Sequence, residues 1–145
     1  APVLGWFGLR IGCICVERGK RTQAIKSMVA AVNSGNSPAG QLIIYPQGTR
    51  IAPGASAPYK IGTAVLYQET GQTCIPAATN VGVFWPKYGI LRQPGLAVIE
   101  FLPAIQPGLS NELFMHRLEE VIEQSSNALL EEAATDGFYP VGQDT

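Results

Sequence analysis

The sequence predicts an α/β domain with a mixed, mostly parallel sheet that is flanked by helices. Two observations favour this class. Short apolar runs rich in strand formers alternate with segments of helical periodicity, and the runs are continuously apolar, as in strands buried on both faces. The 145 residues suffice for one domain with a core, and a composition of 46% hydrophobic and 14% charged residues excludes a disordered chain.

The first part of the chain is expected to alternate between helices and strands. In order, these are a helix over 2–10, a strand over 13–18 (CICVER), a helix over about 23–33 and a strand over 41–45 (QLIIY). Thr22 is a suitable N-cap for the second helix, and the segment NSGNSPAG ends it. Gly40 and Pro46 bound the second strand.

The second part continues the same pattern. It predicts a helix over about 59–70, strands over 73–81 (TCIPAATNV) and 95–102 (GLAVIEFL), and a long final helix. Gly71 ends the first of these helices, and Ser110 caps the last one. The apolar stripe of the final helix comprises Phe114, Leu118, Val121, Ile122, Ser125 and Leu129. We expect residues 1–145 to be a single, partial domain whose tail frays from about residue 136.

Charge is distributed unevenly along the chain. Residues 1–60 contain seven basic residues and one acid, a net charge of +6, whereas residues 61–145 contain three basic residues and ten acids, a net charge of −7. An anionic ligand is therefore expected at the first half, although ordinary scatter of surface charge would give a similar count. Three cysteines (Cys13, Cys15 and Cys74) with no histidine nearby predict reduced thiols and no metal site.

Two polar turns follow the first two predicted strands. Arg18 ends the first strand within VERGKR, and Gly48, Thr49 and Arg50 follow the second. Since the carboxyl ends of parallel strands meet at one edge of a sheet, these residues are expected to lie close together. A glycine lets a ligand approach the backbone, and a guanidinium can donate two hydrogen bonds to a phosphate. A solvated loop and a tight turn with a surface arginine are the simpler alternatives.

The turn YPQGTR resembles the F-P-E-G-T-R signature of the glycerophosphate and lysophosphatidate acyltransferases, the PlsC-like family. Three further blocks follow the family's order. GWFGLRIGCICVERG is similar to its second motif and ends near Arg18, APYKIGTAVL carries Lys60, and CIPAATNV is similar to the fourth motif at Ile75 and Pro76. The resemblance spans roughly residues 2–135 and points to the bacterial 1-acyl-sn-glycerol-3-phosphate acyltransferases.

The resemblance implies a reaction and a set of site residues. The family transfers an acyl group from acyl-CoA or acyl carrier protein to the sn-2 hydroxyl of lysophosphatidate, at the cytoplasmic face of the inner membrane, without metal or other cofactor. The phosphate would be bound by Arg18, Arg50, Gly48 and Thr49, with support from Glu17, Gln47 and Lys60. The acyl site, or packing beside it, would involve Ile75 and Pro76.

The sequence departs from the family pattern in two places. Gln47 replaces the usual glutamate of the signature, which keeps the size and an acceptor but removes the charge. The catalytic H-x-x-x-x-D motif, whose histidine is the general base, is absent, because His116 is followed five residues later by Val121. We expect the motif upstream of this chain, and the chain to be a C-terminal fragment that is inactive by itself.

Other functions remain open at this point. The same family includes enzymes for other acceptors, such as glycerol-3-phosphate or a lyso-ornithine lipid. A non-enzymatic module for anionic lipid headgroups would use the same cations. Nucleic-acid binding is disfavoured because the basic clusters are short and the net charge is −1. The loop VFWPKYG, residues 83–89, is a candidate for contact with a membrane surface.

Overall fold

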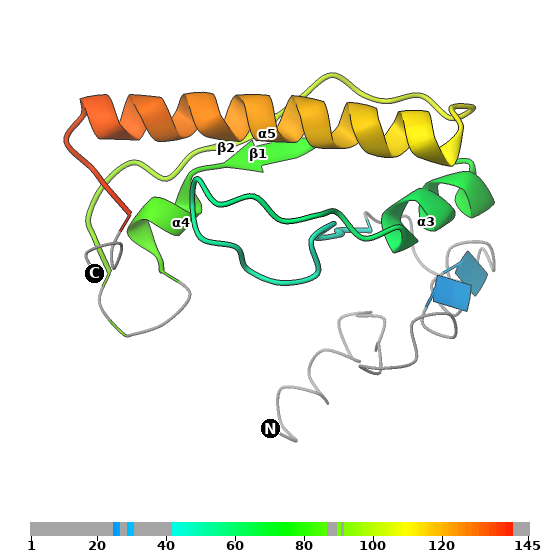
Figure 1. Cartoon of the computed structure of the whole chain (residues 1–145), viewed down its shortest axis with the longest axis horizontal. Coiled ribbons are helices and arrows are strands. Elements are labelled where there is room, and N and C mark those ends of the chain that lie inside the picture. Colours follow the sequence, from blue (N-terminus) through cyan, green and yellow to red (C-terminus); the bar gives the residue numbers. More distant parts are fainter. Residues whose placement is uncertain (1–24, 27–28, 31–41, 87–89, 91, 141–145) are drawn as a thin grey trace.

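The computed structural model describes residues 25–26, 29–30, 42–86, 90 and 92–140. Its named elements are, in chain order, α3 (Gly62–Thr70), β1 (Ala77–Thr79), α4 (Val81–Phe84), β2 (Ile99–Phe101) and α5 (Asn111–Thr135). Figure 1 shows α5 running along the strand pair, with α3 near its first turns and α4 near its last turns. This combination of helices with a small sheet agrees with the α/β class.

The final helix forms as the sequence predicts. The Ser110 hydroxyl accepts a hydrogen bond from the backbone N–H of Leu113 at 3.3 Å and so caps α5 at its predicted start. The predicted apolar stripe faces the rest of the molecule: three of its members are buried and three half-buried, namely Phe114, Leu118 and Leu129, and Val121, Ile122 and Ser125. The amphipathic pattern therefore fixes which face of α5 covers the sheet.

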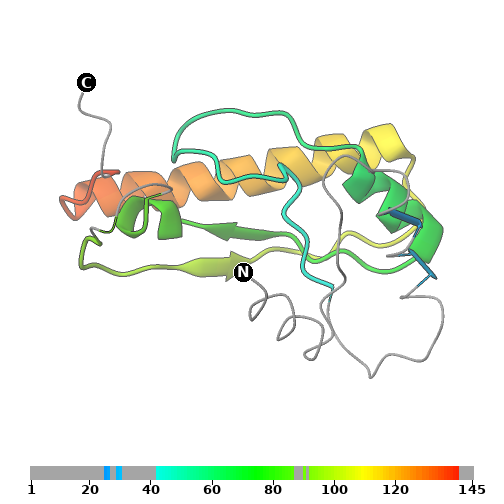
Figure 2. The same ribbon diagram turned by 90° about the horizontal axis from the view of Figure 1, so that it is seen from below.

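The strands β1 and β2 pair antiparallel, with Ala78 opposite Glu100. Figure 2 shows them side by side beneath α5. Ala78 is buried, and Glu100 accepts a hydrogen bond from the Ser125 hydroxyl on α5 at 2.5 Å, so this face of the pair meets the helix. Both strands lie within the predicted ranges but are shorter, and an isolated bridge joins Cys74 to Ile105. The mostly parallel sheet stays a prediction.

The predicted strand over 41–45 is wrong for the structure as described. Residues 42–45 have no strand assignment, and the side chains of Ile43 and Tyr45 are 75% and 78% exposed. Within the described ranges, no segment pairs with this run. A strand forms only where a neighbour satisfies its backbone N–H and C=O groups. The neighbour expected from the sequence, residues 13–18, lies outside the described residues, as does the predicted helix over 2–10.

The helix α3 ends where predicted but starts three residues late. Gly71 adopts the left-handed conformation (φ +59°), and its N–H bonds the carbonyl of Tyr67. The N–H of Thr63 bonds the carbonyl of Lys60 at 3.1 Å, an i to i+3 bond of the 3₁₀ type, and the first i to i+4 bond joins the N–H of Val65 to the carbonyl of Ile61. Residues 25–26 and 29–30, inside the predicted helix over 23–33, are helical.

The main core lies between α3 and α5. The rings of Tyr67 and Phe114 stack with centroids 3.9 Å apart and planes 8° from parallel. The Tyr67 hydroxyl donates to the carbonyl of Gln106 at 2.5 Å and accepts from the N–H of Leu109 at 3.1 Å. One tyrosine therefore packs against α5 and also fixes the loop that leads into it. The Tyr59 hydroxyl adds a second tie, since it donates to Glu123 on α5 at 2.9 Å.

A smaller cluster closes the end of the molecule that holds α4. The rings of Phe84 and Phe138 meet edge to face, 5.5 Å apart. Gly95 packs so tightly here that a Cβ atom on it would lie 2.1 Å from the Cε1 atom of Phe84. The tail expected to fray from about residue 136 is therefore held in part by Phe138, which packs on Phe84. Its last residues, 141–145, lie outside the described part.

We predict that Tyr67→Phe keeps the aromatic stack but lowers the free energy of unfolding by about 1–3 kcal/mol, because the Gln106 carbonyl and the Leu109 N–H lose their partner. The matched control is Tyr45→Phe, the same chemical change at a side chain that is 78% exposed. Chemical denaturation of both variants measures the difference. Equal stability of the two variants would show that the hydroxyl does not hold the loop.

Candidate functional site

A tight turn over Tyr45–Gly48 is the core of the candidate site. The N–H of Gly48 donates to the carbonyl of Tyr45 at 2.9 Å and closes four residues, with Pro46 in the second position, where its fixed φ suits a turn. Gly48 has φ +68°, a conformation that residues with a Cβ rarely adopt. The backbone bends here because proline and glycine occupy the two positions that need them.

Lys60 contacts this turn through both its backbone and its side chain. Its N–H bonds the carbonyl of Pro46, and its side chain lies against Gly48: a Cβ atom on the glycine would be 3.2 Å from the Cε atom of Lys60. The absence of a side chain at Gly48 therefore makes room for the lysine stem. Residues 12 positions apart are brought together, and one of them carries a positive charge.

The polar residues of the turn are open to solvent. Thr49, Arg50 and Lys60 are exposed, and Gln47 is half-buried. Within the described part of the chain, neither Arg50 nor Lys60 forms an ion pair with a carboxylate. Two cations without a neighbouring carboxylate to neutralise them, on a turn whose shape depends on glycine, are suited to an anion.

The other predicted site residues have separate outcomes. Arg18 and Glu17 lie outside the described residues, so their position beside Arg50 stays a prediction. Pro76 is fully buried, whereas the neighbouring Ile75 is 60% exposed. Alternation along the extended chain explains this difference, since neighbouring side chains point to opposite faces. Pro76 is thus a packing residue, and only Ile75 is accessible to an apolar ligand.

The structure adds an apolar surface that the sequence did not single out. Ile99 and Phe101 of β2 are 61% and 75% exposed, on the face of the pair that is turned away from α5. Ile75 extends the β1 side of that face by the same alternation. The register of two strands is needed to see this, and no single run of sequence shows it.

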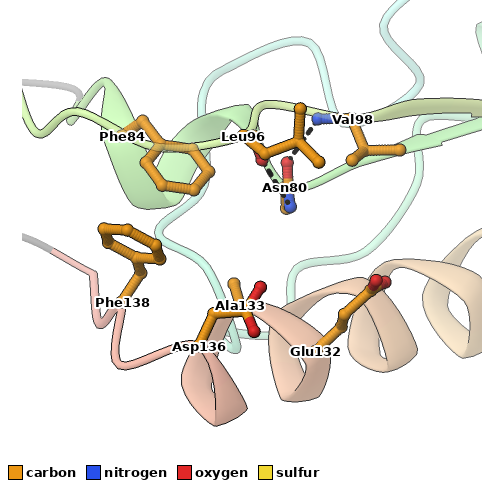
Figure 3. A pocket seen from close by; sticks show the side chains of 8 residues that line it. All are labelled: Asn80, Phe84, Leu96, Val98, Glu132, Ala133, Asp136 and Phe138. Atoms are coloured by element: carbon orange, nitrogen blue, oxygen red, sulfur yellow. Dashed lines mark hydrogen bonds between the residues drawn. The ribbon is translucent and has the colours of Figure 1, made fainter.

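A small cavity lies at the other end of the molecule, between α4 and the last turns of α5 (Figure 3). Its volume is about 20 Å³, room for a single water molecule. The side chain of Asn80 points into it but is already used: its Oδ1 accepts from the N–H of Val98 at 2.8 Å, and its Nδ2 donates to the carbonyl of Leu96. Glu132 and Asp136 lie across from it. The asparagine therefore has a structural role.

No catalytic centre is evident in the described ranges. His116 is an exposed residue of α5. No group of three or more His, Cys, Asp or Glu side chains gathers there to hold a metal. Cys74 is a free thiol whose pKa is raised by burial, which makes it less reactive. None of the described helices is both long and apolar enough to cross a membrane.

Comparison with known proteins identifies the family. A family model described as Acyltransferase matches residues 1–80, more than half of the chain. The chain belongs to the acyltransferase family. This match covers Arg18, the Tyr45–Gly48 turn and Lys60, so the family assignment includes the residues that build the candidate site. The resemblance found from the motifs is thereby confirmed.

Two curated acyltransferases are similar over much of the chain. The 1-acyl-sn-glycerol-3-phosphate acyltransferase of Pseudomonas aeruginosa is 28% identical over 104 residues, which cover 72% of this chain and 40% of that protein. The enzyme of the same name from Saccharomyces cerevisiae is 24% identical over 148 residues, covering 99% of this chain and 48% of that protein. The chain thus spans less than half the length of these relatives. No solved structure matches it.

We predict that Gly48→Ala destabilises the acyltransferase chain more than Gly54→Ala. Both glycines have positive φ, +68° and +76°, so alanine is strained by about 1–2 kcal/mol at either position. Only at Gly48 does the new methyl group also press on Lys60, because nothing lies within 4 Å of the corresponding point at Gly54. Thermal unfolding of the two variants measures the difference, and Lys60→Ala should abolish it. Identical unfolding temperatures would contradict the contact.

Proposed function

We propose that the intact protein carrying this chain transfers an acyl group to the sn-2 hydroxyl of lysophosphatidate and so forms phosphatidate. The observation that carries the proposal is the turn over residues 45–48, which leads into Arg50 and contacts Lys60; within the described residues, neither cation is paired with a carboxylate. Both similar proteins bear the name of a 1-acyl-sn-glycerol-3-phosphate acyltransferase, which supports this acceptor.

In this proposal the turn binds the phosphate of the acceptor. The guanidinium of Arg50 donates two parallel hydrogen bonds to phosphate oxygens, and the Lys60 ammonium adds a point charge. Arg18 is the second guanidinium on the same phosphate. Thr49 offers a hydroxyl. Gln47 stands where the family signature has a glutamate; it is neutral but still accepts hydrogen bonds. Holding the phosphate fixes the distance from it to the reacting hydroxyl.

The reaction needs a general base, which the described residues of this chain do not provide. The acceptor hydroxyl attacks the carbonyl carbon of an acyl thioester, its proton passes to the base, and the thiol leaves with a proton returned to it. His116 is unsuited because it is exposed on the long helix and has no aspartate five residues on. We assign the base to a His-Asp pair that precedes this chain in the intact protein.

The remaining features follow from the same proposal. The thioester donor is acyl-CoA or acyl carrier protein, and no metal or further cofactor takes part. Ile75 contacts the acyl chain. The intact domain contains a mixed, mostly parallel sheet flanked by helices. The protein acts at the cytoplasmic face of a bacterial inner membrane, where its lipid acceptor is found.

We predict that Arg50→Ala and Arg18→Ala in the intact protein each lower kcat/KM for lysophosphatidate about ten- to a hundredfold. The reason is the loss of a charged hydrogen-bonded pair worth about 1.5–3 kcal/mol. The loss should appear mainly as a raised KM, and Arg50→Lys should recover only part of it, because an ammonium cannot bond two oxygens in parallel. The measurement is acyl transfer at varied lysophosphatidate concentration.

The matched control is Arg117→Ala, which removes an exposed arginine paired with Glu120 on α5. It should leave KM unchanged. Full activity of both site variants would contradict the phosphate-binding role. An unmodified protein that acylates glycerol-3-phosphate or a lyso-ornithine lipid but not lysophosphatidate would assign another acceptor. No acyl transfer to any of the three would favour a binding module.

A further inference from the structure

The segment over residues 70–99 differs in charge from everything that follows it. It contains Lys87 and Arg92 and no aspartate or glutamate, in a half of the chain that carries ten acids. Its net charge is therefore +2, whereas residues 61–145 as a whole carry −7. The two cations of this segment are suited to negative charge. Leu96, by contrast, lies at the cavity that Glu132 and Asp136 of α5 also line.

The loop between α4 and β2 also exposes large apolar side chains. Trp85, Ile90 and Leu96 are 56%, 91% and 73% exposed. A single exposed apolar residue is ordinary on a protein surface, but three on one connection form a feature that calls for a partner. Ile90 is the most exposed large apolar side chain of the described residues.

Charge and apolar surface meet in one contact on this loop. The guanidinium carbon of Arg92 lies 4.4 Å from the centroid of the Trp85 ring, a cation–π arrangement. Tryptophan and arginine together are suited to the headgroup layer of a membrane, where the ring is half in apolar surroundings and the cation meets lipid phosphate.

Both ends of the loop are fixed to the rest of the molecule. The N–H of Gln93 donates to the carbonyl of Phe84 at 3.1 Å, and its side-chain amide donates to the carbonyl of Tyr139. Gly95 packs directly on the ring of Phe84. The exposed residues are thus presented from an anchored base, which lowers the entropy lost on binding.

The segment that follows the candidate phosphate-binding turn runs to the end of the molecule that holds α4. After Arg50 the chain continues to Pro53, which packs on α4: a Cβ atom on Gly82 would lie 2.8 Å from the Cγ atom of Pro53. The helix that receives this contact leads directly into the loop with Trp85. Pro53 therefore links the segment after the turn to the helix that precedes the loop, whereas the turn itself lies beside Lys60.

We propose that Trp85, Ile90, Arg92 and Leu96 form a contact with an anionic lipid surface. Arg92 and the Trp85 ring lie among the headgroups, and Ile90 and Leu96 enter the region just beneath them. The inference rests on the proposed function in one respect, since a lysophospholipid acceptor is reached at a membrane. Its test uses lipid binding alone, so that either proposal can fail without the other.

The experiment is flotation of the full chain with vesicles of phosphatidylglycerol and phosphatidylcholine, compared with phosphatidylcholine alone. We expect binding to the mixed vesicles only. Arg92→Gln should weaken it about fivefold, the effect of one basic residue near an anionic surface. Ile90→Ser should weaken it about three- to tenfold through lost apolar contact. The matched controls are Arg117→Gln and Leu113→Ser, an exposed arginine and a 62% exposed leucine on α5.

A second readout does not depend on these variants. The chain has two tryptophans, and Trp6→Phe leaves Trp85 as the single reporter. Its emission should shift to shorter wavelength with the mixed vesicles and be quenched by lipids brominated near the headgroup. An unshifted emission, equal weakening by the control variants, or equal binding to phosphatidylcholine alone would overturn the proposal. Self-association of the chain that Ile90→Ser abolishes, without vesicle binding, would assign the surface to a second copy and also overturn it.

Discussion

The side chain of Tyr67 is the interaction on which the described structure depends most. Its ring stacks on Phe114, and its hydroxyl bonds both the Gln106 carbonyl and the Leu109 N–H, so one residue joins α3, α5 and the loop between β2 and α5. Because α5 in turn covers one face of the strand pair, the position of the sheet relative to α3 follows from this contact. Lys60, just before α3, is thereby held where it can support the turn.

The candidate site combines a rigid support with exposed charge. Pro46 and Gly48 shape the turn, and the Lys60 backbone bonds the Pro46 carbonyl while its side chain fills the space beside the glycine. The exposed turn can therefore keep its shape without a ligand, which favours binding by reducing the ordering that a ligand must cause. At the other end of the molecule, the α4–β2 loop is likewise fixed by hydrogen bonds at its base, and it exposes large apolar side chains.

Local patterns in the sequence were enough to predict α5, its Ser110 cap and the Gly71 end of α3, because these depend on neighbouring residues. The strand over 41–45 was predicted wrongly for the opposite reason: strand pairing is non-local, and no described segment supplies its partner. The turn and Lys60 were found through motif resemblance, whereas their direct contact required the three-dimensional structure. The opposite burial of Ile75 and Pro76 follows from alternation and could have been read from the sequence.

The most direct test of the phosphate site is an NMR titration of the ¹⁵N-labelled chain with sn-glycerol-3-phosphate, the polar part of the proposed acceptor. The account predicts that the largest shifts occur at the backbone amides of Gly48, Thr49 and Arg50 and at Lys60, and that Arg50→Ala removes them while Arg117→Ala does not. Shifts centred on the cavity beside Asn80, or shifts unaffected by Arg50→Ala, would contradict a phosphate site at the turn.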